Sequence, residues 1–224
     1  MDTPTYAQRR GQIEQYFDRT AVAAWERLTS DAPVGRIRAS VRAGRDRMRA
    51  TLLSWLPADL HGRRILDAGC GTGAFAVEAA WRGAEVVAID VAAGLVDVAR
   101  DRCPASLAID WHAGDMLDEA LGDFDHVVAM DSLIHYRPTD IVRAVERLAD
   151  RTRGSVIFTF APQTPALAAM HALGKFFPKG DRAPAIEPVA ERLLRDMLVG
   201  RAIGRTERVA SGFYTSQAME VVSQ

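Results

Sequence analysis

Cysteine is scarce in this chain, and the little there is forms no cluster. Cys70 and Cys103 belong to no Cys-x-x-Cys pair and to no Cys/His group. Disulfide-stapled folds and structural zinc sites are built from such groups, so we expect neither of them. The cysteine usage fits a reducing, cytoplasmic environment.

Long apolar runs and an excess of charge of one sign are also missing. Gln163, His171 and Lys175 interrupt the best candidate for a run of membrane-spanning length. The polar segment 1–10 lacks the apolar stretch and the small-residue cleavage site of an export signal. Because 28 basic residues nearly cancel 29 acidic ones, no whole-molecule field favours nucleic acid, and we expect no nucleic-acid partner.

Apolar residues, by contrast, are plentiful. They make up 48% of the 224 residues, which is enough for one large core. We divide the chain into N-terminal helices over residues 1–62 and an α/β domain over residues 63–224, with the helices covering its site. In the first part, apolar residues at three- and four-residue steps predict one helix face turned toward a core: Ile37, Val41, Met48, Leu52 and Trp55.

From residue 63 onward, short apolar runs alternate with helical patterns. The expected strands cover residues 64–67, 85–90, 108–112, 124–130 and 154–160, and the expected helices cover residues 74–81, 94–102 and 138–150. A further helix over 187–199 and a terminal pair of strands within 206–222 complete the pattern. Alternation of this kind is typical of an α/β fold, a doubly wound and mostly parallel sheet covered on both faces. Such sheets bind ligands beyond the carboxyl ends of their strands.

One segment breaks the alternation. Residues 161–188 are rich in proline, glycine and lysine, and apolar residues recur at helical spacing in their middle. We interpret this segment as an inserted lid or as an element that faces a membrane.

A glycine-rich turn follows the first expected strand, and it reads Asp67-Ala68-Gly69-Cys70-Gly71-Thr72-Gly73. Glycine lets the backbone turn sharply and approach a ligand closely. The spacing alone leaves two interpretations open, because Gly69, Gly71 and Ala74 also satisfy the dinucleotide fingerprint.

Three acidic residues narrow the choice, because they lie at successive strand ends. Asp90 closes the second strand, where a carboxylate can accept both hydroxyl hydrogens of a ribose. Asp115, followed by Met116, lies where an adenine could be bound, and Asp67 is placed to meet an ammonium group. Each acid taken alone could simply cap the next helix. Their joint placement favours a nucleoside ligand.

This order of motifs resembles the class I methyltransferases. The resemblance implies a Rossmann-like, seven-stranded sheet with S-adenosylmethionine (SAM) as co-substrate and S-adenosylhomocysteine (SAH) as product. It also implies cofactor contacts from the following residues: Asp67, Gly69, Cys70, Gly71, Gly73, Asp90, Val91, Asp115, Met116, Asp131, Ser132 and Arg42.

Most of the chain resembles one family more closely, the magnesium-protoporphyrin IX O-methyltransferases. The resembling pieces are Tyr16-Phe17-Asp18 with Trp25, the arginine-bearing helix 37–49, the glycine-rich turn 66–73, and segments 130–136 and 158–162. Two positions depart from the family pattern, since Asp18 replaces an asparagine and Arg45 a histidine. The resemblance implies methylation of one propionate of magnesium protoporphyrin IX to give the monomethyl ester in bacteriochlorophyll synthesis. It also implies contact with a magnesium chelatase subunit.

Catalytic and substrate roles follow from the same resemblance. His135 would orient the carboxylate or contact the porphyrin, and Tyr16 would close over the cofactor. A packed or capping histidine and a core tyrosine are the alternatives. The other expected substrate contacts are Tyr136, Arg38, Phe176 and Phe177.

Arginines recur at helical spacing on a second face of the helix 37–49, and we call this face the arginine edge: Arg38, Arg42, Arg45 and Arg49. A solvated face is the commonest interpretation, because arginine stems cover apolar surface while their heads stay wet. Arg38 or Arg42 could instead anchor the second propionate or the methionine carboxylate. Peripheral attachment to an anionic photosynthetic membrane is the third interpretation.

Three rival functions stay open at this level. One is a methyltransferase acting on a phenol, a quinone precursor or a small acid. Another is a nicotinamide oxidoreductase, which the glycine spacing permits but which gives no reason for Asp115-Met116. The last is a non-catalytic module that binds SAM or porphyrin and hands the porphyrin between partners.

Overall fold

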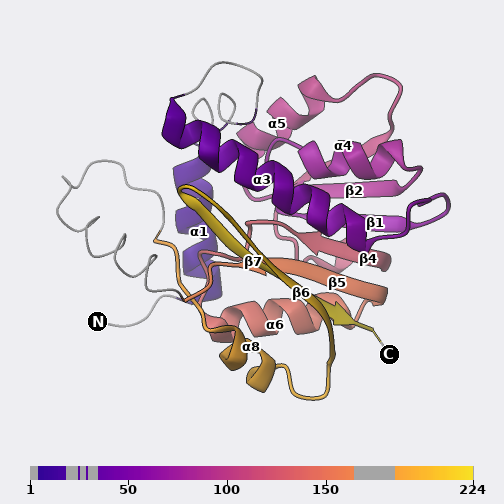
Figure 1. The fold of residues 1–224 in the computed structure, drawn as a ribbon. Coiled ribbons are helices and arrows are strands. Elements are labelled where there is room, and N and C mark those ends of the chain that lie inside the picture. The colour runs from indigo at the N-terminus through magenta and orange to yellow at the C-terminus, as the bar shows by residue number, and fades with distance from the viewer. Residues whose placement is uncertain (1–4, 19–24, 26–28, 30–34, 164–184, 224) are drawn as a thin grey trace.

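The computed structural model describes residues 5–18, 25, 29, 35–163 and 185–223. Its centre is a seven-stranded sheet with the strand order β3-β2-β1-β4-β5-β7-β6 (Figure 1). The strands are β1 (Arg64–Ala68), β2 (Glu85–Asp90), β3 (Ile109–Ala113), β4 (Phe124–Ala129), β5 (Thr152–Phe160), β6 (Ala202–Ser211) and β7 (Tyr214–Val222).

Five strands run parallel and the terminal hairpin completes the sheet. β1 pairs in parallel with β2 and β4, β2 with β3, and β4 with β5. β7 inserts antiparallel to β5, and β6 pairs antiparallel with β7 at the edge. The expected doubly wound, mostly parallel sheet is confirmed. Because β2 and β3 lie on one side of β1 while β4 and β5 lie on the other, the strand order reverses between β1 and β4.

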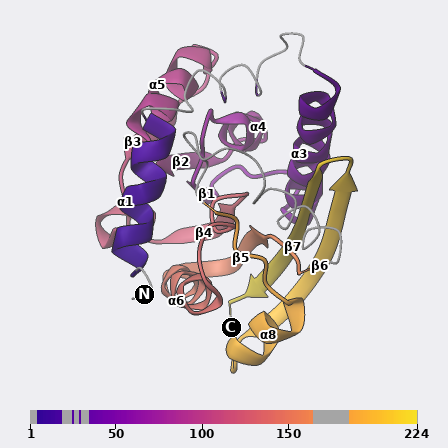
Figure 2. The ribbon, with the colours of Figure 1, turned by 90° about the vertical axis from the view of Figure 1, so that its left-hand side faces the viewer.

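Helices cover both faces of this sheet and flank the carboxyl ends of its parallel strands (Figure 2). They are α1 (Tyr6–Tyr16), α3 (Arg36–Trp55), α4 (Ala74–Trp81), α5 (Ala93–Arg102), α6 (Pro138–Ala149) and α8 (Glu191–Met197), with a short 3-10 turn at Glu119–Leu121. No helix in the described part of the chain is long and apolar enough to cross a bilayer.

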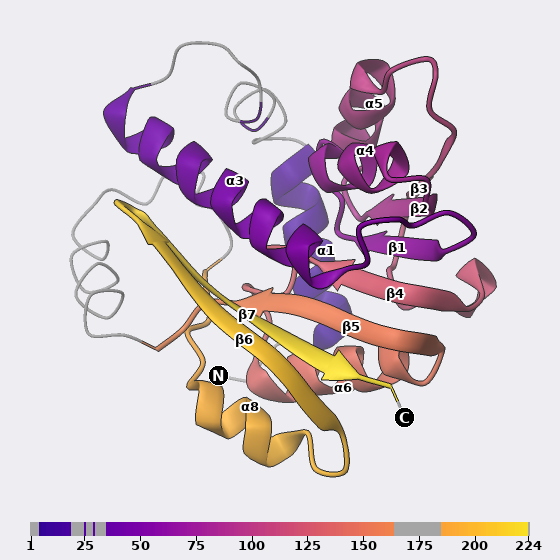
Figure 3. The same ribbon diagram turned by 45° about the vertical axis from the view of Figure 1, so that its right-hand side comes forward.

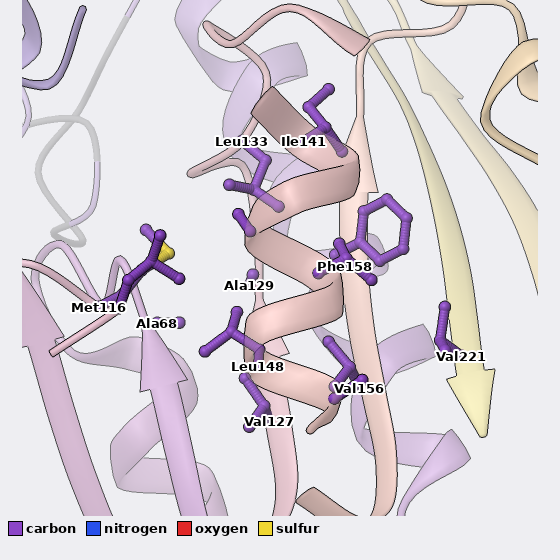
Figure 4. Close-up of a cluster of buried hydrophobic side chains, with 14 of the residues drawn as sticks. Ala68, Met116, Val127, Ala129, Leu133, Ile141, Leu148, Val156, Phe158 and Val221 are labelled. Carbon is purple, nitrogen blue, oxygen red and sulfur yellow. The ribbon is translucent and has the colours of Figure 1, made fainter. Parts of the chain in front are cut away.

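The core has two halves, one on each face of the sheet. α6 packs Ile141, Val145 and Leu148 against Phe158 and other residues of β4 and β5 (Figure 4). On the other face, the core is formed by α3 and α4, with Met48, Leu52 and Phe75 among its members. The N-terminal helices therefore share the core of the α/β domain, since Ile13 of α1 belongs to the first half and α3 to the second.

Several sequence expectations need correction. Ile37 does not face the core, because its side chain is 57% exposed. The tip of the β6–β7 hairpin lies beside α3 (Figure 3). Ser40 Oγ of α3 accepts a hydrogen bond from Phe213 N at 3.4 Å, and Ile37 precedes Ser40 by about one helical turn. β6 begins at Ala202, earlier than expected, and the helix expected over 187–199 is confined to Glu191–Met197.

The two ends of the expected lid are joined by backbone hydrogen bonds. Gln163 N donates to Val189 O at 2.9 Å, and Val189 N donates to Ala161 O at 2.8 Å. Residues 164–184 between them, including Phe176 and Phe177, lie outside the described residues.

Candidate active site

A cavity of about 320 Å³ lies where the strand order reverses, beyond the carboxyl ends of β1 and β4. This is the place at which doubly wound sheets bind ligands, and the volume is that of a small-molecule pocket. Loops after β1, β2, β3 and β4 supply part of its wall. Helices α1, α3, α4 and α5 add further residues, as do Phe17, Trp25 and Thr29. The residues predicted as cofactor or substrate contacts that line it are Asp67, Gly69, Cys70, Gly71, Asp90, Val91, Met116, Asp131, Ser132, Arg42, His135 and Tyr136.

The glycine-rich turn forms the floor of the cavity. Gly69 has a positive φ of 87°, and a Cβ there would lie 2.3 Å from Cβ of Ser132, so only glycine lets the turns after β1 and β4 meet. Gly71 also has a positive φ, of 52°, and a Cβ added there would meet nothing within 4 Å. The turn therefore presents its backbone to a ligand without side chains in the way.

Asp90 is a half-buried acceptor at the end of β2. Its Oδ2 accepts a hydrogen bond from Gly71 N and its Oδ1 one from Ala92 N, both at 2.9 Å. Burial raises the pKa of this carboxyl above its ordinary value. Each oxygen keeps a second lone pair, so the carboxylate can hold the turn and still accept from two hydroxyl groups. The capping and ribose interpretations of Asp90 are compatible.

Asp67 is the most unusual electrostatic feature of the site. Its side chain is 2% exposed, and its Oδ2 has no hydrogen-bond partner among the described residues. Burial and the neighbouring charge of Asp90 raise its pKa to about 7. A buried carboxylate with one oxygen unsatisfied is costly, and a bound cation would compensate for it. Ser132 Oγ, on the same cavity wall, is likewise buried with no partner in the described part of the chain, so the donor and acceptor set fits a polar cation such as the ammonium end of SAM.

Asp115 lies beside the cavity rather than on its wall. Tyr6 OH donates to its Oδ1 at 2.9 Å and Arg10 Nη1 to its Oδ2 at 2.5 Å. Both donors come from α1, so this carboxylate holds the helix, whereas its neighbours Gly114 and Met116 line the cavity. The expected contact between Asp115 and adenine stays a prediction.

His135 and Tyr136 lie on the wall formed after β4. His135 is 7% exposed, and its Nδ1 lies 3.3 Å from Ala185 O, so Nδ1 is the protonated nitrogen. Tyr136 stacks on Tyr6 with the ring centroids 5.0 Å apart, and burial raises the pKa of its hydroxyl.

Other expected site residues lie elsewhere. Tyr16 does not line the cavity, although Phe17 does, and the two rings meet edge to face at 5.1 Å. Arg38 is exposed near the start of α3 and does not reach the wall. Gly73 shapes the turn below the wall, because a Cβ there would lie 2.5 Å from the Trp111 ring.

The arginine edge is not simply a solvated face. Arg42, Arg45 and Arg49 line the cavity, and the side chains of Arg45 and Arg49 are only 22% and 21% exposed. The solvated interpretation is therefore wrong for these two. The predicted site omitted both, although their spacing with Arg42 was visible in the sequence. Phe17 and Trp25 were also omitted as site residues, although the family motif contains them.

Fold and site together define a class I SAM-dependent methyltransferase, and a family profile described as a methyltransferase domain matches residues 65–154. A second profile, described as the C-terminus of magnesium-protoporphyrin IX methyltransferase, matches residues 129–223. The chain is 51% identical to the magnesium-protoporphyrin O-methyltransferase of Rhodobacter capsulatus, over 96% of this chain and 97% of the relative. It belongs to the magnesium-protoporphyrin IX O-methyltransferase family.

Solved structures agree with this assignment. The crystal structure of magnesium protoporphyrin IX methyltransferase from Synechocystis with bound SAH superposes with a TM-score of 0.86 at 26% identity, covering 96% of this chain and 100% of that one. A ubiquinone biosynthesis O-methyltransferase of Xanthomonas oryzae is 39% identical, but over only 52% of this chain. The family assignment removes the nicotinamide oxidoreductase interpretation.

Proposed function

We propose that this enzyme transfers a methyl group from SAM to a propionate carboxylate of magnesium protoporphyrin IX, giving the monomethyl ester in bacteriochlorophyll synthesis. The observation that carries the proposal is the 51% identity over nearly the full length of both chains with a relative of that activity. The cavity supports it, because Asp67, with one oxygen lacking a partner among the described residues, suits a cationic methyl donor, and the arginines suit an anionic acceptor.

Methyl transfer to a carboxylate requires correct positioning of the two substrates more than acid-base catalysis. When bound, SAM supplies an electrophilic methyl group on a sulfonium. A propionate with a pKa of about 4.3 is already ionised at neutral pH, so no protein group has to deprotonate it. Asp67 would hold the ammonium end and Asp90 the ribose, while the apolar walls exclude water from the point where opposite charges meet.

His135 is proposed to contact the acceptor. Its protonated Nδ1 faces Ala185 O and fixes the ring on the wall formed after β4, with Phe17 on its other side at a centroid distance of 6.2 Å. This arrangement suits a residue that orients the porphyrin or its carboxylate. A folded His135→Ala variant with wild-type turnover would remove it from the mechanism.

Acceptor identity is tested by mass spectrometry. Enzyme and SAM are mixed with magnesium protoporphyrin IX, and zinc protoporphyrin and a catechol serve as comparison substrates. We expect one added methyl group on the magnesium porphyrin and none on the catechol. At saturating SAM, turnover should stay flat down to about pH 5, because a carboxylate acceptor stays ionised, whereas a phenol acceptor would lose rate well above that pH. Tight porphyrin binding without turnover would instead favour the carrier module.

We also propose that the enzyme attaches peripherally to an anionic membrane. Ile37 and Phe213 are 57% and 54% exposed and lie at the same end of α3, next to the exposed Arg36 and Arg38. Apolar side chains flanked by arginine suit such a surface. The fraction of enzyme that sediments with anionic vesicles should fall at high salt and in an Ile37→Ser/Phe213→Ser variant. Absence of binding at every salt concentration would refute the idea.

Contact with a magnesium chelatase subunit stays a prediction of the resemblance, to be tested by pull-down with purified subunits.

A further inference from the structure

Asp131, just after β4, is held by donors from three other elements, and we call this group the Asp131 cluster. Its Oδ2 accepts from Arg45 Nη1 of α3 at 2.7 Å. Tyr214 OH of β7 lies 3.1 and 3.2 Å from the two carboxylate oxygens. Ser216 Oγ and Thr159 Oγ1 each lie 3.2 Å from Oδ1. With its side chain only 6% exposed, Asp131 has its acceptor positions occupied by protein donors and little left for the cofactor.

The backbone of Asp131 is fixed as firmly as its side chain. Its φ is +54°, and no other non-glycine residue in the described ranges has a positive φ. Its N–H donates to Thr159 Oγ1 at 2.7 Å, which holds the residue in this left-handed conformation. Unusual backbone conformations that surrounding contacts enforce are concentrated at functional sites. The cluster is therefore rigid, and it borders the cavity.

Arg45 connects the Asp131 cluster to the cavity wall. Its guanidinium lies over the Trp25 ring, 4.8 Å from the centroid, and both side chains line the cavity. Within the described part of the chain, Arg45 makes one hydrogen bond, through Nη1 to Asp131. A guanidinium can bind a second carboxylate through its other N–H groups. Arg49 differs, because its side chain is already paired with both Glu78 and Asp46.

Aromatic rings continue the wall next to Arg45. The Trp25 ring lies 5.7 Å from that of Phe17, which in turn lies 6.2 Å from that of His135. A flat macrocycle can pack on such a wall while a carboxylate at its edge meets the guanidinium.

We propose that Arg45 binds a carboxylate of the acceptor and that Asp131 is the positioning residue that orients Arg45 for this contact. The inference rests on the proposed function, which supplies a flat acceptor with two propionates. It also assigns the Asp131 side chain to acceptor recognition, in place of the cofactor contact expected from the sequence.

The test compares two probes that differ only in their carboxylates. Magnesium protoporphyrin IX and its dimethyl ester are titrated by absorbance into enzyme saturated with SAH, so that no turnover occurs. The wild type should bind the free acid at least about tenfold more tightly than the diester, as expected for a charge-assisted hydrogen bond. In Arg45→Gln this ratio should approach one, and in Asp131→Asn it should fall.

A double variant and a matched control separate positioning from stability. If Asp131 acts through Arg45, the double variant Asp131→Asn/Arg45→Gln should show the same ratio as Arg45→Gln alone. Glu220→Gln is the control. Glu220 is a buried carboxylate whose Oε1 lies 2.6 Å from Arg205 Nη2, and neither residue lines the cavity. It should lower the melting temperature and leave the ratio unchanged.

Several outcomes would overturn the inference. A wild-type ratio near one, or an unchanged ratio in Arg45→Gln, removes the carboxylate contact. Weaker SAH binding in Asp131→Asn with an unchanged ratio makes Asp131 a cofactor residue. If Arg45→Gln does not fold, Arg45→Lys replaces it, and a ratio equal to that of the wild type counts against a role for the guanidinium. A wild type that binds the free acid selectively but does not methylate it refutes the proposed function and leaves this inference standing.

Discussion

Asp67 is the residue at which fold stability and ligand binding conflict. Its side chain is 2% exposed, and one carboxyl oxygen lacks a partner among the described residues. This environment disfavours the ionised form. Because its pKa is about 7, the folded enzyme keeps a proton on Asp67 between about pH 4 and pH 7, where the unfolded chain has already released it. A bound cation reverses this preference. Proton release and SAM binding should therefore be linked.

The linkage predicts opposite pH trends for stability and affinity. Between about pH 4 and pH 7 the folded state binds the extra proton, so the contribution of Asp67 to apo-enzyme stability is lost as the pH rises through that window. SAM affinity should rise over the same range, by up to about tenfold per pH unit below the folded pKa. Calorimetric titration from pH 5 to 8 measures the affinity, and a flat profile would show that Asp67 does not meet the cation.

Asp67→Asn tests the same residue without pH. The amide removes the buried charge, so the apo enzyme at pH 8 should be at least as stable as the wild type, whereas SAM should bind about 10- to 100-fold more weakly. Melting temperature and SAM affinity are measured on the same samples. A large loss of stability with unchanged affinity would mean that Asp67 is structural.

Among the elements, α1 completes one wall of the site although its partners are distant in sequence. Tyr6 and Arg10 both bind Asp115, Arg9 pairs with Glu187 at 2.8 Å, and Tyr6 stacks on Tyr136. These contacts attach the helix to the loops after β3 and β4 and to the segment that precedes α8. Buried apolar packing by α1 is small by comparison, because Ile13 is its one buried residue.

We therefore predict that Asp115→Asn loosens α1 without unfolding the sheet. Removal of a charge-assisted hydrogen bond costs about 1.5–3 kcal/mol, which corresponds to roughly 10- to 100-fold faster amide exchange in the helix. Hydrogen exchange with mass spectrometry should show faster exchange in α1 and unchanged protection in β1 and β4. Glu119→Gln, which affects an exposed ion pair with Arg147, should leave both unchanged. Unchanged exchange in α1 of Asp115→Asn would contradict the tether.

For the molecule as a whole, local patterns predicted the sheet and most of its site. α4 and β2 have the expected bounds, because strong apolar periodicity and glycine turns delimit them. The sequence pattern predicts too late a start for β6, since this strand is a largely exposed edge strand with little alternation. The exposure of Ile37 depends on where the β6–β7 hairpin ends, and the occupation of Asp115 depends on Tyr6, more than a hundred residues away. Tertiary contacts of this kind leave no local signal.

The arginine edge shows the same limit. Spacing placed Arg42, Arg45 and Arg49 on one helix face but could not decide whether that face meets water or a cavity. α3 packs its backbone on the β6–β7 hairpin, where a Cβ at Gly44 would lie 2.4 Å from the Tyr214 ring. This close approach turns the arginines inward. Only the completed sheet supplies the surface that makes it possible.

Transfer of an isotopically labelled methyl group tests the central claim most directly. In the proposed function, the cavity beyond the carboxyl ends of β1 and β4 brings the methyl group of SAM and a porphyrin carboxylate together. Wild-type enzyme given labelled SAM and magnesium protoporphyrin IX should place the label in a single carboxylate ester, and folded Asp67→Ala should lose most of that product. Label that is absent from the porphyrin, or product formation that Asp67→Ala leaves unchanged, would contradict the account.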